Sequence, residues 1–223
     1  MVDFPAPGIP VKQTISFVIG FRTKQLIYEA TGNYYKDSLK KVVMRVFVAI
    51  EISNYELINS IANFQSEIKI QAKPVKPQNL HFTLQFLGEI SEEISQKIKQ
   101  ALQTIEFKTF QVNFKGIGAF PKIKSPRVIW IGTDESGSNL LTSLAKKVEN
   151  AISPLGFIPA KPFKSHITTF RIKNKIGDIS KELEKFKTHE FGSQEISNFK
   201  LKQSVLTPQG PLYSDLGVIK AKL

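Results

Sequence analysis

The chain contains no cysteine, a single tryptophan and only three histidines among its 223 residues. The absence of cysteine excludes disulfide bonds, thiolate metal sites and a cysteine nucleophile. Long hydrophobic runs are also missing: the densest apolar segments, ISFVIGF and RVFVAIEI, have the length of strands, whereas a membrane span needs about 20 apolar residues. We therefore expect a soluble, cytoplasmic protein in which histidines, carboxylates and hydroxyls carry the chemistry.

Acidic residues are scarce compared with basic ones. Asp and Glu number 19 against 31 Lys and Arg, which gives a formal net charge of +12. This excess favours a polyanionic partner, because lysine and arginine displace the counterions that condense on phosphates. A generally basic surface without a specific partner is the alternative that composition leaves open.

The first 43 residues differ from the rest of the chain. They contain the proline-rich segment DFPAPGIP and one short apolar run, and they show no helical period. Met44 then begins MRVFVAIEIS, a compact strand that would make a natural protein start. We interpret residues 1–43 as an N-terminal extension, either an overlong upstream start or an atypical appendage, and residues 44–223 as a single bilobal domain.

The remaining chain alternates strands and helices in two similar halves. Apolar residues that recur at every second position predict strands, and apolar residues that recur with a period of about 3.6 predict helices. Ser91 is expected to cap a helix, and His81, Thr83 and Gln85 to share one strand face, with Phe86 on the other. Strands are predicted from Arg45, at 80–88, 110–116, 127–133, 165–172 and 198–206, and helices at 55–70, from Ser91, at 139–152 and 178–186. This order predicts an α+β fold with two lobes.

Two of the three histidines occur in the same setting, HFTL at 81–84 and HITT at 166–169. Residues i and i+2 of a strand point to the same face, so each motif places an imidazole beside a threonine hydroxyl. A single such motif is ordinarily a structural strand histidine. Two matching motifs, on sheets that face each other, instead predict a shared site.

This pair suits in-line displacement at phosphorus. One imidazole can take a proton from the nucleophile while the other protonates the leaving oxygen, and histidine titrates near neutral pH. The threonine hydroxyls can donate to the non-bridging oxygens. Two histidines without a third ligand at a recognisable spacing argue against zinc, and no glycine-rich nucleotide loop is present. We expect no metal and no cofactor.

The sequence resembles the two-histidine (2H) phosphoesterases, and within them the RNA 2′,3′-cyclic phosphodiesterases that are also described as 2′-5′ RNA ligase-like. The resemblance covers residues 44–223 and rests on both HxTx motifs and on three further segments, MRVFVAIEI, GIGAFPKIKSPRVIWIG and SVLTPQGPLYSDL. It implies a bilobal, pseudo-symmetric fold with two antiparallel sheets facing a central cleft and helices outside. It also implies opening of terminal 2′,3′-cyclic phosphates to 2′-phosphomonoesters, and possible reversal as 2′-5′ ligation.

The resemblance also implies roles for individual residues. His81 is expected to be the proton donor, His166 the proton acceptor, and Thr83 and Thr168 the phosphate-binding pair. The second motif departs from the family at Thr169, where leucine is common.

Several basic and aromatic residues lie near the two motifs in the sequence. Arg127 and Lys164 are candidate substrate-binding cations, with a solvated surface position as the alternative. Arg171 is a third candidate, but it falls on the opposite face from His166 unless the strand bends. Trp130 and Phe120 are favoured as core residues over base-stacking ones, and His189 as a surface residue, by their sequence settings.

The sequence therefore predicts a monomeric, metal-independent phosphodiesterase acting on RNA ends, tRNA fragments among them. Two alternatives remain open. One is a module that binds RNA ends without turning them over, for which a basic cleft would suffice. The other is a phosphodiesterase of a small cyclic nucleotide.

Overall fold

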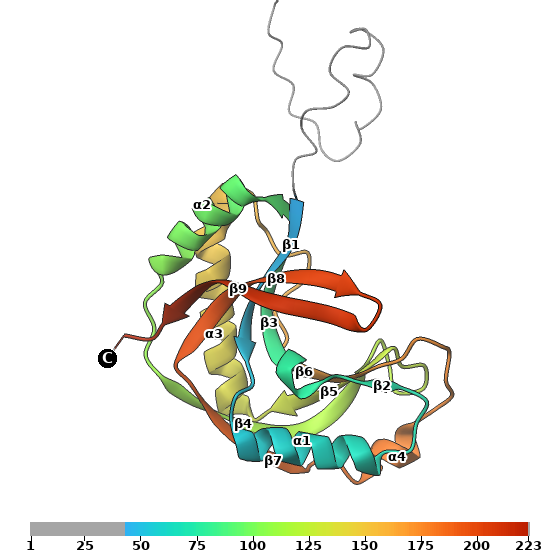
Figure 1. Cartoon of the computed structure of the whole chain (residues 1–223). Helices are drawn as coiled ribbons and strands as arrows, with labels where there is room; N and C mark the ends of the chain where they lie inside the picture. Colours follow the sequence, from blue (N-terminus) through green and yellow to red (C-terminus); the bar gives the residue numbers. More distant parts are fainter. Residues whose placement is uncertain (1–42, 223) are drawn as a thin grey trace, which may run out of the picture. The chain divides into compact units, whose positions relative to one another are not determined.

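One antiparallel sheet runs through the computed structural model of the chain, which describes residues 43–222 (Figure 1). Its strands are β1 Val43–Glu51, β2 Lys73–Pro74, β3 His81–Ser91, β4 Phe110–Phe120, β5 Val128–Thr133, β6 Ile167–Arg171, β7 Glu190–Ile196, β8 Asn198–Thr207 and β9 Gly210–Lys220. The α-helices of this part of the chain are α1 Tyr55–Glu67, α2 Glu92–Gln103, α3 Glu135–Ile152 and α4 Ser180–Glu184. The expected extension, residues 1–43, lies outside the described residues apart from Val43.

The sheet has two halves. Hydrogen bonding orders the strands β7-β4-β5-β6 in one half and β3-β1-β8-β9 in the other, and β2 pairs with β6. Within the described residues, Phe82 and Ile167 are the one residue pair that links β3 to β6. The predicted α+β fold with two antiparallel halves is confirmed, and the halves are joined through this pair into one curled sheet.

The helices lie against the outside of the two halves (Figure 1). α1 contacts β7 and β6, whereas α2 and α3 contact each other and β3. Helix starts follow the capping side chains. Ser91 caps α2 as predicted, and α3 begins ahead of the predicted Asn139 because the Asp134 side chain accepts a hydrogen bond from the Gly137 amide at 3.0 Å. The apolar stripes of these helices complete the core with the buried side of the sheet.

The predicted alternation along β3 is wrong beyond Leu84. Phe86, expected inside, is 75% exposed, and Gln85 is buried with 5% exposure. The pairing of β3 with β1 skips Leu84, so this residue forms a β-bulge that reverses which face the following residues occupy. The buried Gln85 amide donates to the carbonyl of Phe157 at 2.9 Å, so its polar group is satisfied.

Sequence reasoning missed β2, β7 and β9. The segment EFGSQEI has few apolar residues, and GPLYSDLGVIK interrupts its apolar residues with two glycines, a proline and Asp215, so neither pattern predicts a strand. Ladder hydrogen bonds with β4 and β8 supply the order that the local pattern does not. None of the helices within residues 43–222 is long and apolar enough to cross a membrane.

Candidate active site

A cleft of about 1970 Å³ opens beside β3 and β6, where the halves of the sheet meet. The third histidine, His189, is exposed as predicted and lies outside this cleft. All of the site residues that the sequence predicts line the cleft: His81, Thr83, Arg127, Lys164, His166, Thr168 and Arg171.

The joining pair places the two motifs next to each other. Phe82 and Ile167, the middle residues of HFT and HIT, are both fully buried at 0% exposure. Because β3 and β6 run antiparallel, His81 and Thr168 flank this pair on one side, and Thr83 and His166 flank it on the other. Each imidazole therefore has the threonine of the opposite motif as its neighbour across the sheet. Among the described residues, neither threonine hydroxyl has a hydrogen-bond partner, so both are available to a ligand.

The ring of His81 is held by one hydrogen bond and two aromatic contacts. Its Nδ1 lies 2.7 Å from the backbone oxygen of Asn79. A carbonyl can only accept, so Nδ1 carries the hydrogen and Nε2 of the neutral ring keeps its lone pair. The ring centroids of Phe47 and Tyr213 lie 5.2 and 5.4 Å from that of His81. Rotation of the imidazole is thereby restricted.

The surroundings of His166 repeat this arrangement. Its Nδ1 lies 2.7 Å from the backbone oxygen of Lys164, and the rings of Phe120 and Trp130 lie 5.0 and 6.1 Å away. Trp130 and Phe120, which the sequence favoured as core residues, are only partly buried and instead pack against this imidazole. The Lys164 ammonium lies 5.1 Å from the centroid of each of these two rings, a cation–π arrangement that covers the aromatic pair.

A second β-bulge brings Arg171 to the cleft. The pairing of β6 with β5 skips Thr169, whose fully buried hydroxyl donates to the carbonyl of Ile129 at 3.1 Å. The extra residue reverses the alternation beyond it. Arg171 therefore shares the cleft side with His166 and Thr168, although an even strand would place it on the opposite face. Thr169, where the motif departs from the family pattern, is the residue that forms this bend.

Burial is the main cause that lowers the pKa of both imidazoles. The pKa of His81 falls from 6.5 to about 4, with further lowering by Arg171 and Lys202 and opposition from the hydrogen bond to Asn79. The pKa of His166 is also lowered, first by burial and then by the charges of Lys164 and Arg171. Both rings are therefore neutral at pH 7 in the free protein. A bound phosphate, being negative, would favour their protonated forms.

The buried His81 should make folding stability depend on pH. Its folded pKa of about 4 lies below the unfolded value of 6.5, so the unfolded chain binds the proton more readily. The free energy of unfolding should therefore fall as pH decreases from 6.5 to about 4, by roughly 3 kcal/mol in total. Urea unfolding at a series of pH values measures this loss, and His81→Gln should show a shallower dependence. An unchanged slope in that variant would contradict the assignment.

Sequence reasoning missed one group of charged residues at this cleft. Glu51, Lys202 and Asp215 line it on the side of His81, and Lys200 contacts both carboxylates. The signal is weak in the sequence, because these residues meet only through the pairing of β1, β8 and β9, and β9 was not predicted.

Comparisons with known proteins identify relatives of this chain. The curated relatives include an RNA 2′,3′-cyclic phosphodiesterase of Archaeoglobus fulgidus, 42% identical over 79% of this chain and 100% of the relative. A protein of the same name from Aquifex aeolicus is 42% identical over 77% of this chain and 94% of its own length. Among solved structures, TT0787 of Thermus thermophilus is similar with a TM-score of 0.65 and 29% identity, covering 79% of this chain and 97% of that one.

The family described as LigT-like phosphoesterase matches residues 51–130 and 131–213. The fold of Escherichia coli LigT in its apo form is also similar, with a TM-score of 0.66 over 81% of this chain and 99% of that one. The predicted resemblance is thus confirmed, and the chain belongs to the LigT-like phosphoesterase family.

Proposed function

We propose that the protein hydrolyses terminal 2′,3′-cyclic phosphates of RNA to 2′-phosphomonoesters. The observation that carries this proposal is the pair of imidazoles in one cleft, each with Nδ1 bound to a carbonyl and Nε2 left free. Binding alone has no need of two such groups. The names of the relatives support the same activity and the same class of substrate.

In the proposed reaction, His166 Nε2 takes a proton from water as the water oxygen attacks phosphorus. The bond between phosphorus and the 3′ oxygen breaks, and His81 Nε2 gives its proton to that oxygen. Thr83 and Thr168 donate hydrogen bonds to the non-bridging oxygens, and Arg171 neutralises their charge. The phosphate itself makes His81 an acid, because its negative charge raises a pKa that lies near 4 in the free protein. If a 5′-hydroxyl took the place of water, the same steps would open the cyclic phosphate and join the two RNA ends through a 2′-5′ phosphodiester, and reversal of that step would restore the cyclic phosphate and the 5′-hydroxyl.

The charge of the cleft supports an RNA substrate. Its two acidic lining residues, Glu51 and Asp215, are paired with lysines, whereas basic side chains from several segments face the same space. These are Lys73, Lys76, Arg127, Lys161, Lys164, Arg171 and Lys173. A volume of about 1970 Å³ exceeds the need of one cyclic phosphate, which favours an oligonucleotide such as a tRNA fragment. Since one chain supplies all of these residues, a monomer is sufficient.

A short RNA ending in 2′,3′-cyclic phosphate provides the direct test. Incubation in EDTA should give an RNA with a 2′-phosphate, identified by chromatography against 2′- and 3′-phosphate standards. RNA binding without turnover would favour a module that only binds RNA ends. Turnover of cyclic mononucleotides alone would favour a phosphodiesterase whose substrate is a small cyclic nucleotide. Activity that EDTA abolishes would contradict the metal-independent mechanism.

A further inference from the structure

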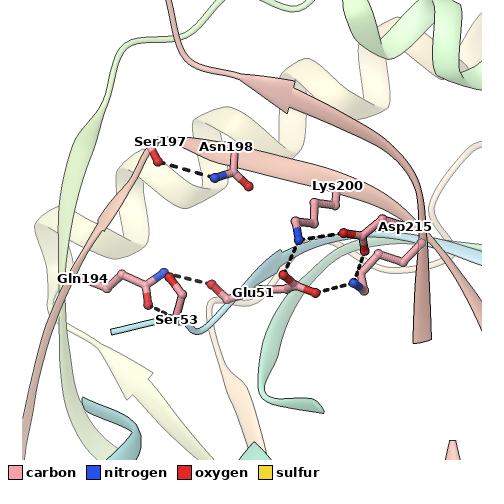
Figure 2. A network of polar contacts seen from close by, with 8 residues as sticks. Glu51, Ser53, Gln194, Ser197, Asn198, Lys200 and Asp215 are labelled. Carbon is pink, nitrogen blue, oxygen red and sulfur yellow. Dashed lines mark hydrogen bonds and ion pairs between the residues drawn. The ribbon is translucent and has the colours of Figure 1, made fainter. Parts of the chain in front are cut away.

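Four charged side chains form a closed network (Figure 2). The network lies on the side of His81 and takes no part in the steps above. Lys202 Nζ forms ion pairs with both Glu51 and Asp215. Lys200 Nζ contacts the same carboxylates at 2.5 and 2.7 Å. We call these four residues the charge cluster. Two lysines alternate with two carboxylates, so the cluster has no net charge.

The cluster is shielded from much of the solvent. The Lys202 side chain is 5% exposed and that of Lys200 is 20% exposed, so both ammonium groups have lost most of their water. Buried ionic groups of this kind are often no more stabilising than apolar residues of the same size. Violations of ordinary core composition tend to occur at functional sites. The position of the cluster therefore favours a role beyond folding stability.

Glu51 is the member closest to His81 in the sheet. The two residues pair directly in the β1–β3 ladder. The backbone oxygen of Glu51 accepts a hydrogen bond from the Gln194 side chain of β7 at 2.9 Å, and the same side chain accepts from the amide of Ser53 (Figure 2). This part of β1 is thus fixed from the opposite half of the sheet, which leaves the Glu51 carboxylate little freedom to move away from His81.

Lys202 and Asp215 reach His81 through the two aromatic rings that hold it. Lys202 pairs with Phe47 in the β1–β8 ladder and with Asp215 in the β8–β9 ladder. Asp215 follows Tyr213 by two positions on β9, so the two side chains share a face. The ion pairs of Lys202 with Glu51 on β1 and with Asp215 on β9 therefore tie together the two strands that carry Phe47 and Tyr213.

We propose that Glu51, Lys202 and Asp215 are positioning residues for His81. They hold Phe47 and Tyr213 against its ring and fix the charge that the imidazole meets on its buried side. The proposal deepens the proposed function, because it rests on the role of His81 in hydrolysis.

The charges around His81 predict the direction in which each substitution should shift the pKa of its imidazole. Arg171 and Lys202 favour the neutral imidazole, Glu51 favours the protonated one, and burial exceeds all three in lowering its pKa. Removing one member unbalances a cluster that is otherwise neutral. Among the charged and titratable groups on the elements packed against His81, those that line the cleft or belong to the cluster are Glu51 on β1, Arg171 on β6, Lys200 and Lys202 on β8, and Tyr213 and Asp215 on β9.

The test is an NMR titration of the His81 ring in the full chain, together with the pH profile of kcat/KM on RNA with a cyclic end. Lys202→Met leaves an excess carboxylate and should raise the pKa of His81, by about one unit. Glu51→Gln leaves an excess ammonium and should lower it. The double variant is neutral again and should return the pKa toward the wild-type value. The limb of the rate profile that titrates with His81 should move in the same direction in each variant.

Matched substitutions in an exposed ion pair of α3, Lys146→Met and Glu149→Gln, serve as controls and should leave the titration unchanged. Shifts of the same sign in both cluster variants, or no shift in either, would overturn the proposal. Thermal melts identify a variant that fails to fold, in which case the isosteric Glu51→Gln decides alone. Because the titration needs no turnover, it remains informative if the RNA is not hydrolysed, and failure of the two proposals can be told apart.

Discussion

Alanine at His81 or at His166 is expected to lower kcat on RNA with a 2′,3′-cyclic end by about 10²- to 10⁴-fold. This is the usual contribution of a positioned general acid or base. KM should change much less, because the hydroxyls and the cationic residues of the cleft still bind the phosphate. Single-turnover measurements with saturating enzyme separate the chemical step from product release.

His189→Ala is the matched control for both variants, since this third histidine is exposed and lies outside the cleft. Its activity should equal that of the wild type. The double variant of His81 and His166 should lose little more than the worse single variant, because the imidazoles act in one concerted displacement. If the fold-loss of kcat in the double variant equalled the product of the two single losses, the imidazoles would act independently. Unaffected turnover in either single variant would remove that residue from the mechanism.

The second large effect is expected from the threonines. Thr83→Val and Thr168→Val keep the shape and the strand preference of the side chain but remove the hydroxyl. Each should lower kcat by roughly 10- to 1000-fold, as the loss of one oxyanion donor does elsewhere. Steady-state kinetics of each variant should show that kcat falls more than KM rises, because negative charge on the non-bridging oxygens increases in the transition state.

Thr104→Val provides the comparison, since Thr104 ends α2 and does not line the cleft. Its kinetics should match those of the wild type. A rise in KM with unchanged kcat in the Thr83 and Thr168 variants would instead assign these hydroxyls to ground-state binding.

The sequence predicted which residues line the cleft better than it predicted how the strands orient them. Both HxT motifs are local signals, and the helices that support them start at capping residues that can be read directly, such as Ser91. The bulges at Leu84 and Thr169 could not be read in this way, because an extra residue in a strand is defined only by its pairing partner. For this reason the exposure of Phe86 was predicted wrongly and the approach of Arg171 was left undecided.

The charge cluster and the aromatic neighbours of the imidazoles escaped prediction for a related reason. Phe47 and Tyr213 are far apart in the chain, and Phe47 meets His81 through the pairing of β1 with β3, whereas Tyr213 meets it only through the place of β9 in the sheet. A strand interrupted by glycine, such as β9, owes much of its order to the ladder it joins. Non-local pairing therefore hid the part of the site that holds the chemistry in place.

The ladder pair Phe82–Ile167, the one that links β3 to β6 among the described residues, couples the two motifs through the core. Both side chains are fully buried, and each follows a catalytic candidate directly in the chain. The relative position of His81 and His166 is therefore set by strand pairing inside the core rather than by the loops that surround the cleft. Substitutions that repack this buried pair should disturb both imidazoles together, whereas changes in the surrounding loops should leave their spacing intact.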